Sequence, residues 1–377
     1  MLEVLVLRDS SAKKREAQRR PVRGLESEGT MATTTDVEKL ARKRDGTVNE
    51  ATPFDTIAKI AGGACLPRSL HAVADLGVAD ALDDQPRTPA DLAAAVGAHP
   101  DSLARVLRLL SAYGIFEMDG DKVRHSPASR LLRSDHPHSM RAFARMFGND
   151  MNWNAYIEFA HSVRTGQPAT TKTLPRGFWA YFQENPEAAR IFNEAMVSKA
   201  QAQVPAVVAA YDFSRFGTIA DIGGGRGHLL QALLEAYHSA RGVLFDLPNV
   251  IQDAAGATSD RLKLQAGDFF KESLPAADAF IVMEVIHDWA DEESLSIFKA
   301  IRRAAKPGAT LLVIEQLIPD DNEPHWSKML DIHMLTLLGG KQRTGKEYGE
   351  LLRRTGFELL RLHPTRSDVS IMEAKAV

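Results

Sequence analysis

The stretch Thr218-Ile-Ala-Asp-Ile-Gly-Gly-Gly-Arg-Gly-His-Leu-Leu230 decides the fold of this chain. It begins as a short apolar run, breaks into glycines and resumes with apolar residues at helical spacing, which predicts a strand, a tight turn and a helix over residues 225–237. Glycine lacks a Cβ, so the turn can take unusual backbone angles and let a ligand approach the backbone. Because a helix start presents unpaired N–H groups, a nucleotide-type ligand is expected at this turn.

Strands and helices alternate from this stretch to the C-terminus. Apolar runs predict strands at 218–222, 242–246, 262–266, 277–283 and 309–315. Helical spacing predicts helices at 292–305, 326–338 and 346–354, the last opened by a capping box at Thr344-x-x-Glu347. The final strands, 357–362 and 369–374, are joined by a short loop and should pair antiparallel. The fold class is therefore α/β, a doubly wound sheet that ends in an antiparallel hairpin.

The N-terminal part has the pattern of a winged helix. Two helices are expected, at 88–96 and 102–113, and a hairpin over 114–125 has Asp119-Gly120 at its turn. The second helix carries Arg105 and Arg108 but is otherwise apolar, whereas a helix that reads DNA needs a polar, basic face. This favours a structural or dimerising use over DNA binding.

We expect four regions along the chain. They are a disordered leader at 1–50, a winged-helix domain at 51–136, a helical block rich in aromatic residues at 137–210 and the nucleotide-binding domain at 211–377. The leader mixes charges without apolar periodicity, and Met31 offers a second plausible start within it. The aromatic residues of the helical block either form ordinary core or line a pocket for a flat aromatic ligand.

Composition limits the possible functions. Hydrophobic residues make up 44% and charged residues 25% of the 377 residues, as in ordinary globular proteins. A net charge of −3 gives no reason to expect a nucleic-acid or membrane partner, and no apolar run approaches the roughly 20 residues of a membrane helix. Cys65 is the single cysteine, which excludes a disulfide within the chain, makes a thiolate metal cluster implausible and fits a cytoplasmic protein.

The residues around the glycine turn indicate which nucleotide binds. Gly223, Gly225 and Gly227 have the spacing G-x-G-x-G, close to the dinucleotide fingerprint G-x-G-x-x-G, so a nicotinamide-dependent oxidoreductase is one alternative. Asp221 stands directly before the turn, where a carboxylate is badly placed for a pyrophosphate and well placed for a cation. S-adenosylmethionine carries a sulfonium and an ammonium and has no phosphate.

Two further carboxylates end the next two strands. Asp246 lies about twenty residues beyond the turn, where a carboxylate can bridge ribose hydroxyls. Asp268, in Gly267-Asp-Phe-Phe270, is placed to accept from an adenine amino group while Phe269 flanks the ring. Each aspartate alone could be a cap or turn residue. Because ligands bind outside the carboxyl ends of the strands, three in register favour one shared crevice.

Five motifs together resemble the S-adenosylmethionine-dependent O-methyltransferases of the caffeic acid and acetylserotonin type. The motifs are Asp221-Ile-Gly-Gly-Gly-Arg-Gly227, Phe245-Asp-Leu-Pro248, Gly267-Asp-Phe-Phe270, His287-Asp-Trp289 and Gly339-Gly-Lys-Gln-Arg-Thr344. The resemblance runs from about residue 55 to the C-terminus and implies a Rossmann-like methyltransferase sheet, a homodimer formed through the N-terminal domain and an aromatic small-molecule acceptor. It adds Leu247 and Met283 to the cofactor site, the latter where the family has a lysine.

Methyl transfer to a phenol needs a base, because a phenol with a pKa near 10 is mostly un-ionised at neutral pH. His287 follows strand 277–283 on the same rim as the aspartates and is the candidate base. Glu315, at the end of the neighbouring strand, is the candidate that orients the imidazole. The resemblance supports both roles and expects a second glutamate where this chain has Gln342. Asp288 is expected to bind the acceptor or to cap the following helix.

The resemblance also points to residues of the acceptor pocket. They are Asn193, Met196, Asp331, Met334 and Gln342. No metal is expected. Two other functions remain open at this stage: a transcriptional regulator with a winged helix and a ligand-sensing second half, and a relative that performs decarboxylation or hydroxylation, which Gln342 leaves possible.

Overall fold

The computed structural model describes residues 52–254, 256 and 259–377, so the predicted leader at 1–50 lies outside the described residues. The chain divides after Ile60 into two compact units. The first unit contributes helix α2 (Pro53–Ala61), on which Phe54, Ile57 and Ile60 are all more than 70% exposed. Their spacing puts these three side chains on one apolar stripe of the helix.

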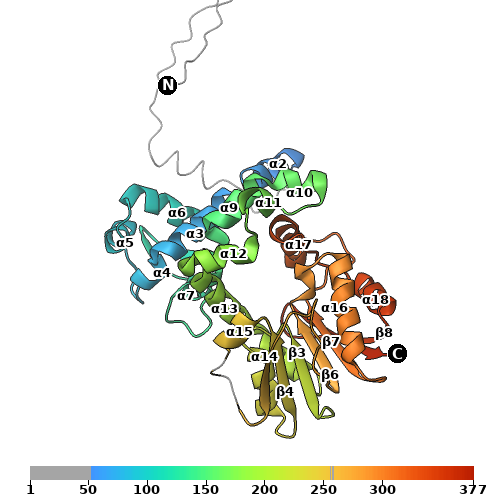
Figure 1. Ribbon diagram of the computed structural model, residues 1–377. Helices are drawn as coiled ribbons and strands as arrows, with labels where there is room; N and C mark the ends of the chain where they lie inside the picture. Colours follow the sequence, from blue (N-terminus) through green and yellow to red (C-terminus); the bar gives the residue numbers. More distant parts are fainter. Residues whose placement is uncertain (1–51, 255, 257–258) are drawn as a thin grey trace, which may run out of the picture. The chain divides into compact units, whose positions relative to one another are not determined.

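A seven-stranded sheet forms the C-terminal half, with the strand order β5-β4-β3-β6-β7-β9-β8 (Figure 1). The strands are β3 (Thr218–Ile222), β4 (Arg241–Asp246), β5 (Leu262–Ala266), β6 (Ala279–Met283), β7 (Thr310–Glu315), β8 (Phe357–Pro364) and β9 (Ser370–Ala376). The chain runs outward from β3 to β5 and then returns to β6 beside β3, so a topological switch point lies between β3 and β6. This confirms the predicted doubly wound α/β sheet.

The antiparallel hairpin at the end of the sheet is also confirmed. β3 to β7 are parallel, whereas β9 pairs antiparallel with both β7 and β8. The last strand is therefore inserted between β7 and β8 and covers the edge of β7. Residue Glu315 at the end of β7 is paired with Ser370 at the start of β9, which helps to keep that end of the sheet rigid.

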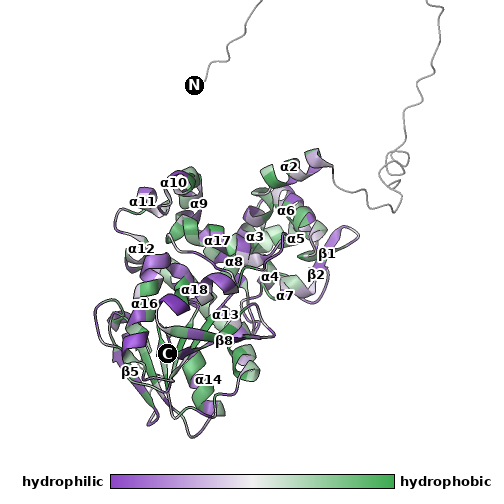
Figure 2. Ribbon diagram, turned by 90° about the vertical axis from the view of Figure 1, so that its right-hand side faces the viewer, coloured by the Kyte–Doolittle hydropathy of each residue, from purple (hydrophilic) through white to green (hydrophobic). Residues whose placement is uncertain are grey.

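Helices cover both faces of the sheet, because the strand residues alternate between two cores. On one face Phe280 and Val282 pack against α16 (Asp291–Ala304) and α18 (Gly345–Arg354). On the other face Ala279 and Ile281 pack against α13 (Pro186–Ala210) and α14 (His228–Ala236). Figure 2 shows the apolar residues of the strands and of α14 in green. The remaining helices of this half are α15 (Pro248–Asp253) and α17 (Trp326–Leu337).

The predicted winged-helix pattern is present in the N-terminal part. Its elements are α3 (Cys65–Leu76), α4 (Val78–Ala81), α5 (Pro89–Val96), α6 (Pro100–Ala112), β1 (Phe116–Asp119), β2 (Lys122–His125) and α7 (Pro127–Arg130). Thr88 caps α5 as expected. The hairpin turn is centred on Gly120 and Asp121, one residue later than predicted, because Asp119 still pairs with Lys122. Leu103, Leu107 and Leu110 of α6 are buried in the core, whereas Arg105 and Arg108 are exposed.

The stretch between the two halves is helical. It contains α8 (Arg141–Gly148), α9 (Asp150–Ile157), α10 (Phe159–Thr165), α11 (Thr170–Thr173), α12 (Phe178–Glu184) and the long helix α13. α13 contacts both α8 and α14, so it links this block to the sheet. The four-region division of the chain stays a prediction. None of the helices within the described ranges is long and apolar enough to cross a membrane.

Candidate active site

The glycine turn follows β3 and is built on left-handed backbone angles. Gly223, Gly225 and Gly227 have φ of +72°, +60° and +76°. For this reason α14 begins only at His228, three residues after the predicted start. A Cβ at Gly223 would lie 2.9 Å from Val285, whereas one at Gly225 would meet no atom within 4 Å. The turn therefore packs against the β6 side and stays open at Gly225, where a ligand can approach the backbone.

Asp221 lies beneath this turn, 1% exposed, and its Oδ1 has no hydrogen-bond partner among the described residues. Burial, together with the nearby charge of Asp246, raises its pKa to about 7. A buried carboxylate without a partner is unfavourable in its charged form. A cationic ligand in this crevice would relieve that penalty, whereas a pyrophosphate would increase it.

Asp246 connects the ends of two neighbouring strands. Its Oδ2 accepts the backbone N–H of Gly225 at 2.8 Å and its Oδ1 accepts the N–H of Leu247 at 2.7 Å. Burial raises the pKa of Asp246, and these two hydrogen bonds oppose the shift. The carboxylate is thus fixed next to the open side of the glycine turn. Leu247 is 46% exposed beside it.

The third carboxylate of the series is more exposed. Asp268 forms an ion pair of 2.8 Å with Lys271, which lowers its pKa, and it accepts the N–H of Phe270 at 2.9 Å. Phe269 packs at a ring distance of 5.9 Å against Trp289. Met283, at the end of β6, is half-buried against the core under the crevice. The carboxyl ends of β3, β4, β5 and β6 therefore bring all the predicted cofactor residues to one edge of the sheet.

His287 lies on the same edge, in the short helix η2 (Ile286–Asp288) that follows β6. Its Nδ1 is 2.6 Å from Oε2 of Glu315, at the end of β7. The other oxygen of Glu315 accepts the backbone N–H groups of Ile286 at 2.9 Å and His287 at 3.3 Å. One buried carboxylate thus fixes both the turn and the ring. Because Nδ1 is held in this way, Nε2 is the nitrogen that is available for chemistry.

Carboxylates surround the imidazole. Asp288 Oδ1 is 3.5 Å from Nε2 of His287. Burial alone would lower the pKa of His287, but Glu315, Asp288 and Glu284 outweigh it and raise the pKa to about 9. Burial also raises the pKa of Asp288, to about 6. The imidazole therefore holds its proton strongly, as a base that must take a proton from a weakly acidic hydroxyl should.

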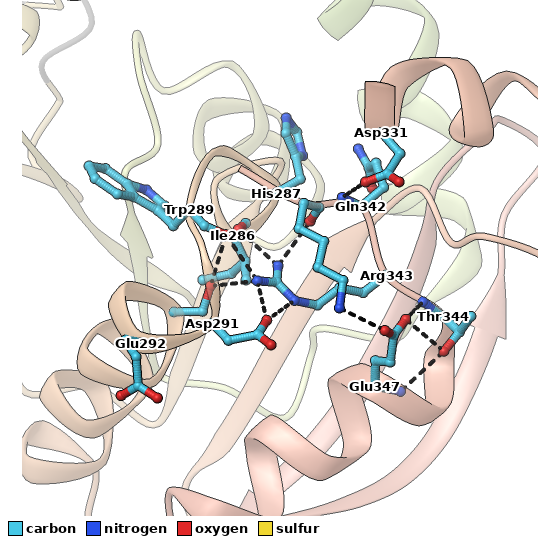
Figure 3. Close-up of polar contacts among 12 residues, drawn as sticks. Ile286, His287, Trp289, Asp291, Glu292, Asp331, Gln342, Arg343, Thr344 and Glu347 are labelled. Atoms are coloured by element: carbon cyan, nitrogen blue, oxygen red, sulfur yellow. Dashed lines mark hydrogen bonds and ion pairs between the residues drawn. The ribbon is translucent and has the colours of Figure 1, made fainter. Parts of the chain in front are cut away.

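The segment 339–344 supports η2 from behind (Figure 3). The N–H of Lys341 donates to the carbonyl of His287 at 2.9 Å, and a Cβ at Gly340 would overlap that same carbonyl oxygen. Arg343 is fully buried; its guanidinium donates to the carbonyl of Trp289 at 2.9 Å and pairs with Asp291 at 2.8 Å. In Figure 3 the His287 ring points away from this network. The motif therefore fixes the backbone of the turn, whereas Glu315 fixes the ring.

Gln342, which stands where the family has a glutamate, is held through its backbone. Its backbone N–H donates to Asp331 at 2.9 Å, and its side-chain amide is fully buried without a hydrogen-bond partner among the described residues. Burial raises the pKa of Asp331. Met334, one helical turn along α17, is buried as well. These three residues lie together on α17 and the segment after it, and their role in acceptor binding stays a prediction.

Two cavities lie near this edge. A cavity of about 410 Å³ is lined by Asp288, Trp289, Phe178, Trp179 and the end of α17. A larger one, of about 1050 Å³, lies on the α8 side of α13 and includes Asn193 and Arg226 but not His287. Met196 packs against the core between α8 and α13. The predicted acceptor residues therefore do not line one cavity, and the aromatic slot next to Asp288 is nearer to His287.

Two charged residues near His287 carried no signal in the sequence. Lys199 of α13 and Glu284, between β6 and η2, form an ion pair of 2.7 Å with both side chains largely buried. A lone lysine within a long helix is ordinarily a solvated residue. Lys199 also lies 85 positions before Glu284 in the sequence. Tertiary packing alone brings the two together.

Comparisons with known proteins agree with this geometry. A model of the O-methyltransferase domain matches residues 156–358, and a model of the O-methyltransferase dimerisation domain matches residues 58–135. The chain is 39% identical over 334 residues to the phenazine O-methyltransferase PhzM of Lysobacter antibioticus, a match that covers 87% of this chain and 98% of that protein. It is 36% identical to the mitomycin biosynthesis 6-O-methyltransferase of Streptomyces lavendulae, with 85% and 93% covered.

A solved structure gives the same result. The O-methyltransferase from neocarzinostatin biosynthesis, in complex with S-adenosylmethionine and 2-hydroxy-5-methyl naphthoic acid, is similar with a TM-score of 0.70 and 34% identity, over 83% of this chain and 96% of that one. The chain therefore belongs to the S-adenosylmethionine-dependent O-methyltransferase family, and its cofactor is S-adenosylmethionine. This membership sets aside the oxidoreductase and the transcriptional regulator.

Proposed function

We propose that this enzyme transfers a methyl group to a phenolic hydroxyl of an aromatic or polyketide-type small molecule, with His287 as the general base. The observation that carries the proposal is the 2.6 Å contact between His287 Nδ1 and Glu315 at the edge of the cofactor crevice. A buried imidazole whose Nδ1 is held by a carboxylate has its Nε2 free to take a proton.

The protein's part in the reaction is to bind, orient and deprotonate. The cofactor supplies an electrophilic methyl group, so the acceptor hydroxyl must lie in line with it and lose its proton. His287 Nε2 takes that proton, and Glu315 stabilises the imidazolium that forms. Asp288, at 3.5 Å from Nε2, is placed to accept a hydrogen bond from the acceptor or to share the charge. The segment 339–344 keeps this pair on a fixed backbone.

The residues of the crevice fit S-adenosylmethionine. Asp221, buried beneath the turn with an oxygen that lacks a partner, suits the positive charges of the cofactor. Asp246 beside the open Gly225 is placed for the ribose hydroxyls, and Leu247 lies exposed next to it. We assign Asp268, Phe269 and Met283 to the adenine side, since they end β5 and β6 further along the same edge.

An aromatic acceptor is supported by the cavity beside Asp288. Phe178, Trp179 and Trp289 give it flat, polarizable walls, and about 410 Å³ is sufficient for a ring system of two or three fused rings. The neocarzinostatin relative holds a hydroxynaphthoic acid, and the other two relatives act in phenazine and mitomycin biosynthesis, which agrees with this class. Asn193, Met196, Asp331, Met334 and Gln342 are the further acceptor residues we propose.

The test is replacement of the base. His287→Ala should lower kcat by at least about a hundredfold, the usual contribution of a general base, while the Kd of S-adenosylmethionine changes little. His138→Ala, an exposed histidine, is the matched control. Wild-type turnover in His287→Ala would rule out the base assignment. Turnover is measured with a panel of phenols, hydroxynaphthoates and hydroxyphenazines.

The same assay separates methylation from decarboxylation or hydroxylation. Product mass shows whether the acceptor gains a methyl group, loses carbon dioxide or gains oxygen. Retention of both His287 and Glu315 in hydrogen-bond contact favours methylation, because transfer of a methyl group to a hydroxyl requires removal of the hydroxyl proton. A product without the added methyl group would exclude the proposed function.

A further inference from the structure

Glu284 has an unusual backbone conformation directly before the catalytic turn. Its φ is +52°, the sole left-handed value for a residue other than glycine within the described ranges. The conformation is unfavourable for a side chain with a Cβ, so other contacts must hold it. Its N–H donates to the carbonyl of Ile314 at 2.9 Å, which continues the β6–β7 ladder by one residue.

The side chain of Glu284 is held on both sides. Oε2 forms the 2.7 Å ion pair with Nζ of Lys199, and Oε1 accepts the side-chain N–H of Gln316 at 3.0 Å. The side chains of Lys199 and Glu284 are 20% and 11% exposed, so solvent screens the pair only weakly. Gln316 follows Glu315 directly, so the pair is attached to the same strand end that orients His287.

Several charged groups therefore act on one imidazole. Glu315 of β7, Asp288 of η2 and Glu284 at the end of β6 raise the pKa of His287, and Lys199 of α13 acts on Asp288 and Glu284. On α17, His333 is buried and its pKa is lowered to about 4 by burial and by Lys199, so it stays neutral. Arg343, behind η2, is engaged by Asp291 and backbone carbonyls. Lys199, held in its ion pair with Glu284, is thus the positive charge that acts on these carboxylates.

We propose that Lys199 and Glu284 are a positioning pair for His287: Glu284 strengthens the imidazole as a base, and Lys199 limits that effect. The inference rests on the proposed role of His287. In this proposal α13, a helix of the connecting block, controls how strong a base His287 is. Burial favours a neutral Glu284, but Lys199, His287 and the hydrogen bond from Gln316 together outweigh it and lower the pKa of Glu284, so this carboxylate carries its charge beside His287.

The test is a charge cycle. Glu284→Gln keeps the shape and removes one negative charge, so the protonation midpoint of His287 should fall by about one pH unit. Lys199→Met removes one positive charge and should raise the midpoint. The double variant Lys199→Met/Glu284→Gln should return it towards the wild-type value. Charge-preserving Lys199→Arg and Glu284→Asp should leave it unchanged, and they keep the test valid where Lys199→Met folds poorly.

Two readouts keep this inference separate from the base assignment. An NMR titration of the His287 ring carbons, identified by the signal that His287→Asn removes, reports the midpoint whether or not His287 is the base. The pH profile of kcat/KM reports it only where His287 is the base. Two results would refute the pair's role. One is a midpoint shift of the same sign in Glu284→Gln and Lys199→Met; the other is a midpoint in both variants that agrees with the wild-type midpoint within 0.2 pH unit. Loss of S-adenosylmethionine binding in Lys199→Met with an unchanged midpoint would assign the pair to the cofactor and refute it too.

Discussion

At the scale of single residues, the site is a balance of buried charges. His287 has three carboxylates around it and one lysine beyond them, and Asp221 and Asp246 are buried at the ends of neighbouring strands. The cofactor brings two positive groups into this acidic edge. Binding of the cofactor therefore reduces the repulsion among the carboxylates, and its positive charge disfavours protonation of His287.

The first prediction concerns pH. Since the pKa of His287 is raised to about 9, the imidazole is protonated at neutral pH and the neutral base grows as pH rises. Below the midpoint, kcat/KM for the acceptor should increase about tenfold per pH unit. With cofactor bound, the sulfonium disfavours the imidazolium, so the midpoint at saturating S-adenosylmethionine should lie below that of the free enzyme. A flat profile from pH 6 to 9 would contradict this.

The second prediction concerns Asp221 and stability. Its folded pKa of about 7 lies above the ordinary aspartate value of 3.8, so the ionised group destabilises the fold above pH 7, and the penalty disappears as pH falls to 3.8. Asp221→Asn should raise the free energy of unfolding of the cofactor-free enzyme at pH 8, by up to about 3 kcal/mol, and should abolish the stabilisation by S-adenosylmethionine.

Asp268→Asn is the contrast for this measurement. Lys271 lowers the pKa of Asp268, so that group stabilises the fold above its unfolded pKa and the stabilisation is lost as pH falls. Its replacement should lower the melting temperature slightly at pH 8, the opposite sign to Asp221→Asn. Calorimetric melting curves at several pH values check both. A lower melting temperature for Asp221→Asn at pH 8 would contradict the penalty assigned to its charge.

At the scale of elements, the segment 339–344 determines where His287 lies. It crosses behind η2 so closely that only glycine fits at Gly340, and the buried Arg343 ties the carbonyls of Ile286 and Trp289 to Asp291. The capping box of Thr344 and Glu347 then starts α18, which packs on the sheet. The helix η2, which carries His287, is thereby attached to the core at two points, Glu315 and Arg343.

The third prediction follows from this contact. Gly340→Ala should displace η2, because the added Cβ overlaps the His287 carbonyl, and kcat should fall by about tenfold or more with a loss of about 1–3 kcal/mol in stability. Gly349→Ala in α18 is the matched control, since its Cβ would meet only Leu359 at 3.3 Å. Kinetics and melting curves are compared for the two. Full activity in Gly340→Ala would mean that the turn does not depend on this contact.

At the scale of the whole molecule, we propose that two copies associate through the N-terminal part. The dimerisation-domain match begins at residue 58, within α2, and the exposed stripe of Phe54, Ile57 and Ile60 lies on that helix. Three large apolar side chains at more than 70% exposure are costly for an isolated chain. A second copy of this chain is the occupant that the family match favours.

The fourth prediction tests that assembly. Light scattering should give twice the chain mass of 41.4 kDa for the wild type. Serine at all three positions, Phe54, Ile57 and Ile60, removes apolar area and should shift the equilibrium towards the single chain at low concentration. Serine at the exposed Thr165 and Thr171 is the control. A dimer of unchanged stability in the triple variant would show that α2 lies outside the interface.

The sequence by itself determined the sheet and the edge that carries the chemistry. Apolar alternation located the strands within about two residues, and the positions of Asp221, Asp246, His287 and Glu315 at strand ends followed from it, because the ends of parallel strands meet at one edge. Local signals such as the capping box at Thr344 depend on residues that are close together in the sequence, so they could also be predicted.

Only the tertiary structure decided which charged groups surround His287. Lys199 lies on a helix 85 positions before Glu284, and no local pattern marks either residue; their contact, and with it the charge around His287, exists because α13 packs over the carboxyl edge of the sheet. The acceptor cavity likewise joins η2 to α12 and α17. Side chains distant in sequence set the electrostatics, since a pKa depends on what lies within a few ångström and not on what is adjacent along the chain.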